Sequence, residues 1–313
     1  MHPAFSVVFL TTLIGAGQGL FLALYSVDVA GRHDLVARVG DARFFVAGAF
    51  LAAALGVLGL VASLFHLGHP ERGWRAAAQW RTSWLSREVI ALPAFIVGVC
   101  LYGVAYHLGS SAVLPLGLLT LVACLALFAC TSMIYACIRF LQEWASPLTL
   151  INFFLLGSAS GFTLATALAG VLAPEQRTLY ATAAMALTAL ALVFRAASLR
   201  RNARLKPKSS LQTAIGIRHQ RIAQKSQGFT GGSFNTREFF HGVAPAGLRA
   251  VKWVFVLFTF VLPVALLALG LAAESPTWFA AAFAVQYVGL LAERWFFLAQ
   301  ANHPQNLYYQ CIS

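Results

Sequence analysis

The residues best suited to proton chemistry lie between positions 63 and 89, in the run SLFHLGHPERGWRAAAQWRTSWLSREV. His66 ends an apolar stretch, and Glu88 begins the next one. Histidine titrates near neutral pH, and partial burial raises the pKa of a glutamate carboxyl into the same range. Such a pair can exchange protons with a quinone, whose carbonyls also need hydrogen-bond donors. Further candidates for a quinone site in this run are His69, Arg81, Trp84 and Arg87.

The same run also fits a second interpretation, in which it only marks the membrane surface. Trp74, Trp80 and Trp84 would then form an aromatic belt, and the neighbouring arginines would extend toward lipid headgroups. The spacing of these residues leaves both interpretations open.

Polar residues in other apolar segments are candidates to support the site. Arg139 and Glu143 are four residues apart, which favours an ion pair at a helix end over a functional role. Glu293 and its neighbour Arg294 form a buried pair that is either structural or part of a site. Gln18 lies among three glycines, so we expect close helix packing and an interhelical hydrogen bond there.

No metal site is expected in this chain. The five cysteines form no CxxC pair, which argues against iron-sulfur or zinc ligation. Haem needs paired histidines on facing helices, and His107 has no partner at its membrane level. We therefore expect no two-haem relay. His66, His69 and His303 lie near the cytoplasmic side and leave a single haem open there, although none is expected.

The elements that must position these residues are transmembrane helices. Hydrophobic side chains make up 59% of the 313 residues and charged ones 10%, against about 25% charged in soluble domains. Runs of about 20 apolar residues recur along the chain, each long enough to cross a bilayer as a helix. We predict an all-α integral membrane protein, a single domain containing a bundle of eight transmembrane helices. The predicted spans are 6–30, 44–66, 89–108, 113–138, 148–172, 178–196, 250–273 and 277–301.

The basic residues predict an orientation. Loops two, four and six, which join every second pair of spans, carry seventeen lysines and arginines if Arg195 to Lys252 all belong to loop six, and the opposite loops carry four. Basic loops stay in the cytoplasm, so both termini and the His66–Glu88 region are predicted to be cytoplasmic. Without loop six the ratio is five to four, and the bias nearly disappears.

Loop six, residues 197–249, is long and basic, and it contains four phenylalanines between 229 and 240. Exposed aromatic side chains on a basic segment are typical of protein docking, although a loop that folds over its own bundle fits equally well. The net charge of +12 does not indicate nucleic-acid binding, because charges that flank spans are explained by topology and anionic lipid.

Several motifs resemble the membrane anchor subunits of dimethyl sulfoxide reductase-type enzymes, the DmsC-like family. Apart from the glycine-rich first span with Gln18, they are HLGHPERGWRAAAQWRTSWLSREV at 66–89, RFLQEWASPLTLINFF at 139–154, SFNTREFFHG at 233–242 and LLAERWFFL at 290–298. The likeness covers nearly the whole chain. Loop six departs from the pattern, because it is longer than in the shorter respiratory members.

The resemblance implies a haem-free eight-helix anchor in the bacterial inner membrane. It implies two partners, a four-cluster iron-sulfur subunit and a catalytic subunit with a molybdenum pterin cofactor. The family's quinol-binding histidine and glutamate match His66 and Glu88. With this site on the cytoplasmic side, the chain looks like the anchors of cytoplasmic sulfite-oxidising enzymes, which pass electrons to ubiquinone or menaquinone.

Two alternatives follow from the same observations. The first is a menaquinol-oxidising anchor of a dimethyl sulfoxide reductase-type enzyme, which would run electrons in the opposite direction. The second is a transporter, which would show inverted repeats and helices broken at mid-membrane. No repeat is evident, and only Pro263 falls in the middle of a predicted span, where it should kink the helix.

Overall fold

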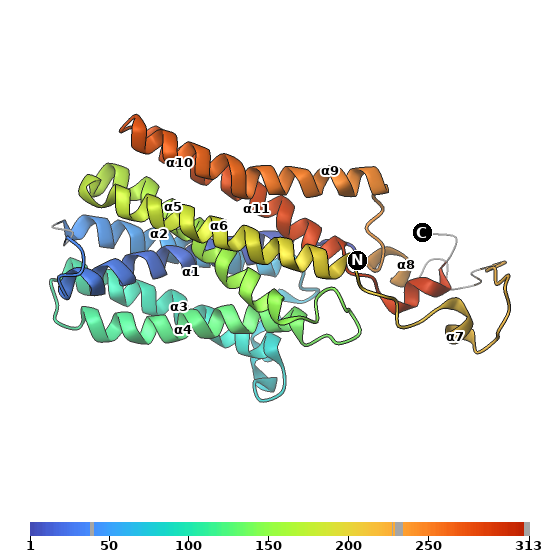
Figure 1. The fold of residues 1–313 in the computed structure, drawn as a ribbon. Coiled ribbons are helices and arrows are strands. Elements are labelled where there is room, and N and C mark those ends of the chain that lie inside the picture. Colours follow the sequence, from blue (N-terminus) through green and yellow to red (C-terminus); the bar gives the residue numbers. More distant parts are fainter. Residues whose placement is uncertain (38–40, 227, 229–233, 310–313) are drawn as a thin grey trace.

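The computed structural model describes residues 1–37, 41–226, 228 and 234–309, and every regular element among them is a helix (Figure 1). The long helices are α1 (Phe5–Arg32), α2 (Ala42–Leu64), α3 (Trp84–His107), α4 (Val113–Ala136), α5 (Pro147–Leu172), α6 (Arg177–Asn202) and α11 (Pro276–Ala299). Helix α9 (Pro245–Val256), the π-helical turn η4 (Leu257–Val261) and α10 (Leu262–Ala272) form one further continuous rod. The short helices are η1 (Pro70–Gln79), η2 (Pro174–Gln176), α7 (Leu211–Ile215), α8 (Asn235–Glu238) and η5 (Pro304–Tyr308).

Seven of these helical stretches are long and apolar enough to cross a membrane: α1 to α6, with η2 included in the sixth, and the α9–α10 rod. The eighth predicted span corresponds to α11, which has 24 residues but is not among the seven. Its last turns contain Glu293 and Arg294, which lower its hydropathy, and both side chains are buried. All eight predicted ranges are therefore helical in the structure, and seven of them are also apolar enough to cross a membrane.

Capping residues explain where several helices begin. Helix α3 begins five residues before the predicted span, because the Ser83 hydroxyl accepts a hydrogen bond from the backbone N–H of Ser86. Ser146 caps α5 in the same way, with Pro147 in the first turn. The turn from α3 to α4 contains Gly109 at a φ of +61°, a conformation that glycine adopts without strain.

The centre of the bundle is formed by α1 and α5, which have the largest buried fractions of the seven stretches. The two helices approach each other through glycines. A Cβ placed on Gly19 would lie 2.0 Å from the carbonyl oxygen of Gly157, so no larger residue fits. The predicted close packing around Gln18 is confirmed, and its Nε2 donates a 2.8 Å hydrogen bond to the Cys124 carbonyl of α4.

The rod from α9 to α10 accommodates Pro263 through a π-helical turn just before it. Proline has no N–H, so a carbonyl about one turn earlier loses its helical partner. The Thr259 carbonyl instead accepts a hydrogen bond from Gln286 Nε2 of α11, at 3.2 Å. A neighbouring helix thus satisfies the backbone, as is common in membrane helices.

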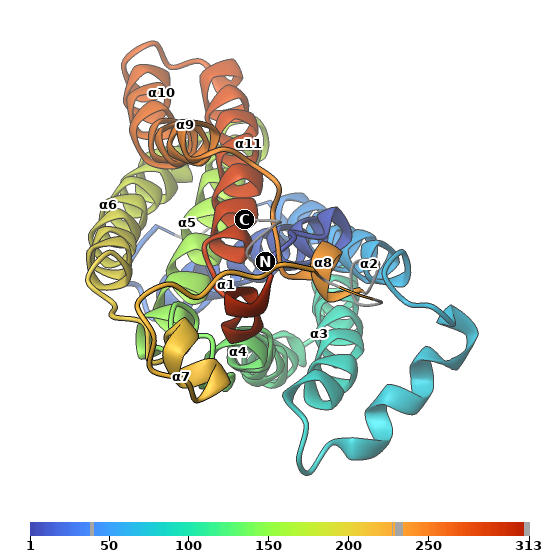
Figure 2. The same ribbon diagram turned by 90° about the vertical axis from the view of Figure 1, so that its right-hand side faces the viewer.

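Successive long helices run in opposite directions, so the N-terminus and Tyr309, the last described residue, lie at one end of the bundle, called here the terminal end (Figures 1 and 2). This end also holds the loop with η1, the turn at 137–146, and α7 and α8. Seen along the bundle, η1 projects sideways from it (Figure 2).

Loop six packs partly against the C-terminal segment. The Tyr308 hydroxyl donates to the Ala214 carbonyl at 2.9 Å, and Asn306 Nδ2 donates to the Phe239 carbonyl at 3.1 Å. The Phe239 ring stacks on His303, whereas Phe234 stays exposed. Residues 227 and 229–233 of the loop lie outside the described residues. Part of the loop therefore folds on its own chain, and Phe234 is the described phenylalanine of the loop that remains exposed.

Candidate functional site

Glu88 is the buried acidic group at the terminal end of α3. It lies in the second turn of the helix and is 6% exposed. Its Oε1 accepts a 2.5 Å hydrogen bond from the hydroxyl of Thr131, which lies near the terminal end of α4. This distance is at the short end of the range for a hydroxyl donor. The carboxyl is thus fixed in one orientation at the edge of the bundle.

His66 lies just beyond the last residue of α2 and is exposed. Partial desolvation by the surrounding protein lowers the pKa of its imidazole below the ordinary value. At neutral pH the ring is therefore largely uncharged and able to accept a proton. The structure places His66 and Glu88 at the same end of neighbouring helices, as the antiparallel pairing predicts. No hydrogen bond joins these two described residues. A proton that passes from one to the other therefore needs a group between them that can carry it.

The other residues of this run have mainly structural partners. Arg87 Nε donates to the Trp80 carbonyl and Arg87 Nη2 to the Arg81 carbonyl, both at 2.8 Å. The Arg87 guanidinium also stacks over the Trp84 ring, at 4.2 Å. Arg87 thereby ties the end of the η1 loop to α3. Arg81 is exposed and stacks on Trp80, which leaves its donors available to a ligand.

His69 faces solvent rather than the bundle. Its Nδ1 lies 3.0 Å from Glu71 Oε1, and both side chains are more than 60% exposed. Of the six candidates in this run, only Glu88 is buried among other helices.

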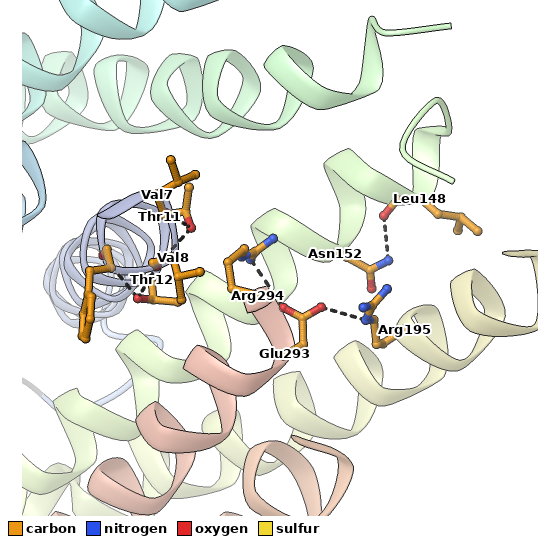
Figure 3. A network of polar contacts seen from close by, with 10 residues as sticks. Val7, Val8, Thr11, Thr12, Leu148, Asn152, Arg195, Glu293 and Arg294 are labelled. Carbon is orange, nitrogen blue, oxygen red and sulfur yellow. Dashed lines mark hydrogen bonds and ion pairs between the residues drawn. The ribbon is translucent and has the colours of Figure 1, made fainter. Parts of the chain in front are cut away.

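A second charged cluster lies inside the bundle at the terminal end (Figure 3). Glu293 of α11 forms a 2.7 Å ion pair with Arg195 of α6, and its other oxygen lies 3.8 Å from Arg294. All three side chains are at most 4% exposed. Figure 3 shows Glu293 between the two arginines, with Asn152 of α5 beside Arg195. Buried charges of this kind persist only when they are paired.

Arg195 corrects part of the predicted topology. Its charge was counted with loop six, although the predicted span 178–196 contains the residue, and the structure places it inside α6, which continues to Asn202. The sequence contained the signal that identifies it. An acid and a base adjacent in an apolar helix, Glu293 and Arg294, need a further partner, and Arg195 is the basic residue at the matching depth of α6.

The predicted ion pair of Arg139 and Glu143 is wrong. Helix α4 ends at Ala136, so the two residues are not on a helix and their spacing of four does not bring them together. Glu143 instead accepts a 3.4 Å hydrogen bond from Asn302 Nδ2, and Arg139 is exposed. Thr131 was missed, because a threonine in an apolar run gives no sign of the carboxyl it faces.

Seven stretches able to cross a membrane, with buried charged groups near one end, define a helical membrane protein. The chain belongs to the DMSO reductase anchor subunit (DmsC) family, whose model matches residues 1–295. It is 52% identical to a sulfite dehydrogenase subunit from Allochromatium vinosum, with the full length of both chains covered. The predicted family is therefore confirmed, and the chain is a membrane anchor subunit of an oxidoreductase complex.

Proposed function

We propose that this chain is the membrane subunit of a sulfite-oxidising complex and that quinone is reduced at its terminal end. The full-length similarity to the Allochromatium vinosum sulfite dehydrogenase subunit supports the substrate of the complex. The observation that carries the quinone site is the buried Glu88 carboxyl, held by Thr131, with the exposed His66 at the same end of the neighbouring helix α2. Sulfite itself would be oxidised in a partner subunit.

Reduction of a quinone to a quinol takes two electrons and two protons. In the proposed scheme the electrons come from the last iron-sulfur cluster of a four-cluster partner, which in turn receives them from a molybdenum pterin subunit. Glu88 would supply one proton from its carboxyl, and His66 would take up the other from the cytoplasm and pass it to the quinone. Arg81, with unused donors, would hold a ring carbonyl, and the Trp84 and Arg87 stack would form a wall of the site.

The partner would dock at the terminal end. A cleft of about 540 Å³ opens there between the 137–146 turn, the end of α6 and the C-terminal segment. Lys206 and Lys208 line it, together with Glu143 and His303. Basic side chains of this kind steer an acidic partner surface during association. Gln18 and Glu293 support the arrangement from inside the bundle.

In the proposed arrangement the chain crosses the bacterial inner membrane eight times, and α11 is the eighth crossing. Helix α11 has the length of a span, and its charged residues are buried against α5 and α6 rather than facing lipid. Both termini and the partners would be cytoplasmic, as the basic loops indicate. Labelling of single cysteines introduced at exposed positions 35 and 208 would test the sidedness, and only position 208 should react from the cytoplasm.

Purification from native membranes tests the function directly. The proposal predicts that the chain co-purifies with iron-sulfur and molybdenum subunits and that sulfite reduces added quinone in the complex. Two results would contradict it. One is a chain that purifies alone, and the other is a complex with this membrane subunit intact in which sulfite reduces only soluble dyes.

A further inference from the structure

A small cavity lies between α1, α4, α5 and α11, beside the Glu88–Thr131 hydrogen bond. Its volume is about 10 Å³, close to the minimum for one water molecule. Its polar lining residues are Thr11, Thr12, Gln18, Thr131, Ser160 and Arg294. These polar groups come from four helices and share the lining with apolar residues, and the cavity reaches Thr131 of the candidate site and Arg294 of the buried charged cluster.

The hydroxyls around the cavity already donate their hydrogens elsewhere. Thr11 donates to the Val7 carbonyl at 2.9 Å, Thr12 to the Val8 carbonyl at 2.8 Å, and Ser160 to the Gly157 carbonyl at 3.0 Å. Thr131 donates to Glu88. These oxygens therefore remain available only as hydrogen-bond acceptors.

Arg294 supplies the opposite character. Its guanidinium is fixed over the Phe153 ring at 3.7 Å and beside Glu293, and Figure 3 shows it between Glu293 and Thr11 and Thr12 of α1. Its Nε–H has no hydrogen-bond partner among the described residues, although the side chain is 4% exposed. A buried donor of this kind needs an acceptor.

We propose that the cavity binds one ordered water, which accepts a hydrogen bond from Arg294 Nε and donates one to Thr131 Oγ1. The role given to Glu88 in this proposal rests on the proposed quinone site. Arginine can only donate, so the chain from Arg294 through the water and Thr131 runs in one direction and ends on Glu88 Oε1. Oε1 is then always an acceptor, and Glu88 takes up and releases its proton at Oε2.

Arg294 and Thr131 are therefore positioning residues for Glu88, which they reach from outside the site. The titratable groups within electrostatic range of this carboxyl are Cys130 and Tyr135 on α4, and of these Cys130 is also near Arg87 and Tyr135 near Arg294. His66 lies at the end of the adjacent α2. None of these groups donates a hydrogen bond to Oε1 among the described residues, which leaves Thr131 as the donor that orients the carboxyl.

Infrared spectroscopy tests this series of hydrogen bonds. The sample is the intact complex, acidified to protonate Glu88. The C=O stretch of Glu88 is identified by its loss in Glu88→Gln. We expect Thr131→Val to shift this band to higher wavenumber, because Oε1 loses its donor, and Thr131→Ser to leave it in place. Arg294→Met should shift the band in the same direction by a smaller amount.

The water itself is tested by electron cryomicroscopy of the parent complex and of Thr131→Val. Density within hydrogen-bond distance of Arg294 Nε and Thr131 Oγ1 in the parent, weakened in the variant, supports the proposal. A cavity without density, or a C=O band that does not move in Thr131→Val, overturns it even if Arg294→Met fails to assemble. Neither measurement requires quinone turnover. Both can therefore contradict the bound water while the proposed function stands, and both can support the water even if quinone turnover fails.

Discussion

Gly161 of α5 faces Gly19 of α1 so closely that a Cβ on Gly161 would lie 2.0 Å from the carbonyl carbon of Gly19. Backbone, not a flexible side chain, occupies that space. Small residues at such crossings let membrane helices pack by direct backbone approach. Because α1 packs against α2 and α5 packs against α4, this contact helps to position the two helices that pack against α3, which carries Glu88.

Gly161→Ala should destabilise the complex by at least about 3 kcal/mol, the upper end of overpacking costs, because the two helices must separate. The measurement is thermal unfolding in detergent. Gly15→Ala is the matched control on the same seam, since its Cβ would lie 3.6 Å from the Gly157 Cα, an ordinary contact. Equal melting temperatures for the two variants would show that the seam is not tightly packed.

Glu88→Gln should lower sulfite-dependent quinone reduction by about a hundredfold, the lower range for loss of an acid–base group. Glutamine keeps the shape and the acceptor for Thr131 but cannot carry a proton. Dye-linked sulfite oxidation, which bypasses the quinone, should stay unchanged and report assembly. Quinone-linked turnover that matches the parent rate would remove Glu88 from the site.

The pH dependence of quinone-linked turnover should contain a contribution from His66. Desolvation lowers the pKa of this histidine, so its protonation midpoint should fall below about 6.5, the value of a free imidazole. The folded protein disfavours the charged ring, so stability should decline slightly as the pH falls through 6.5 toward that midpoint. His66→Gln should remove the titration from the rate profile. His107→Gln, at the other end of α3, should leave the profile as it is, and a change there would indicate a general effect.

Arg195→Met should cost about 3–5 kcal/mol of stability, because it leaves a buried glutamate without its 2.7 Å partner. Arg195→Met combined with Glu293→Gln should cost less than the sum of the two single changes. A double-mutant cycle from unfolding in detergent measures the difference. The pair of Arg177 and the exposed Glu274 is the control, and its cycle should give less than about 1 kcal/mol. Additivity at Arg195 and Glu293 would mean that the two charges do not depend on each other.

The sequence predicted features that depend on hydrophobic runs and on small residues. The helix ranges and the hydrogen bond of Gln18 are of this kind, because a long apolar run in a membrane has few alternatives to a helix and a glycine-rich face must pack closely. The Arg139–Glu143 pair failed because the pattern assumed a helix that ends three residues earlier. Where helices end depends on tertiary contacts such as the Trp144 indole donating to the Phe297 carbonyl, which the local sequence does not contain.

The candidate site could be predicted only as far as residue types go. Glu88 and His66 stand out because they are titratable groups at the ends of apolar runs. Their different environments could not be predicted, since burial of Glu88 depends on Thr131, 43 residues away. The pairing of Arg195 with Glu293 was likewise not predicted, because the two residues are 98 positions apart and meet only through packing of α6 and α11.

The position of the quinone ring is the central claim and can be measured directly. Electron cryomicroscopy of the assembled complex with a quinone or a quinone-site inhibitor should show the ring head beside Glu88 and His66, on the face that carries the iron-sulfur partner. Ring density at the opposite end of the bundle, near the α1–α2 or α3–α4 turns, would contradict the account.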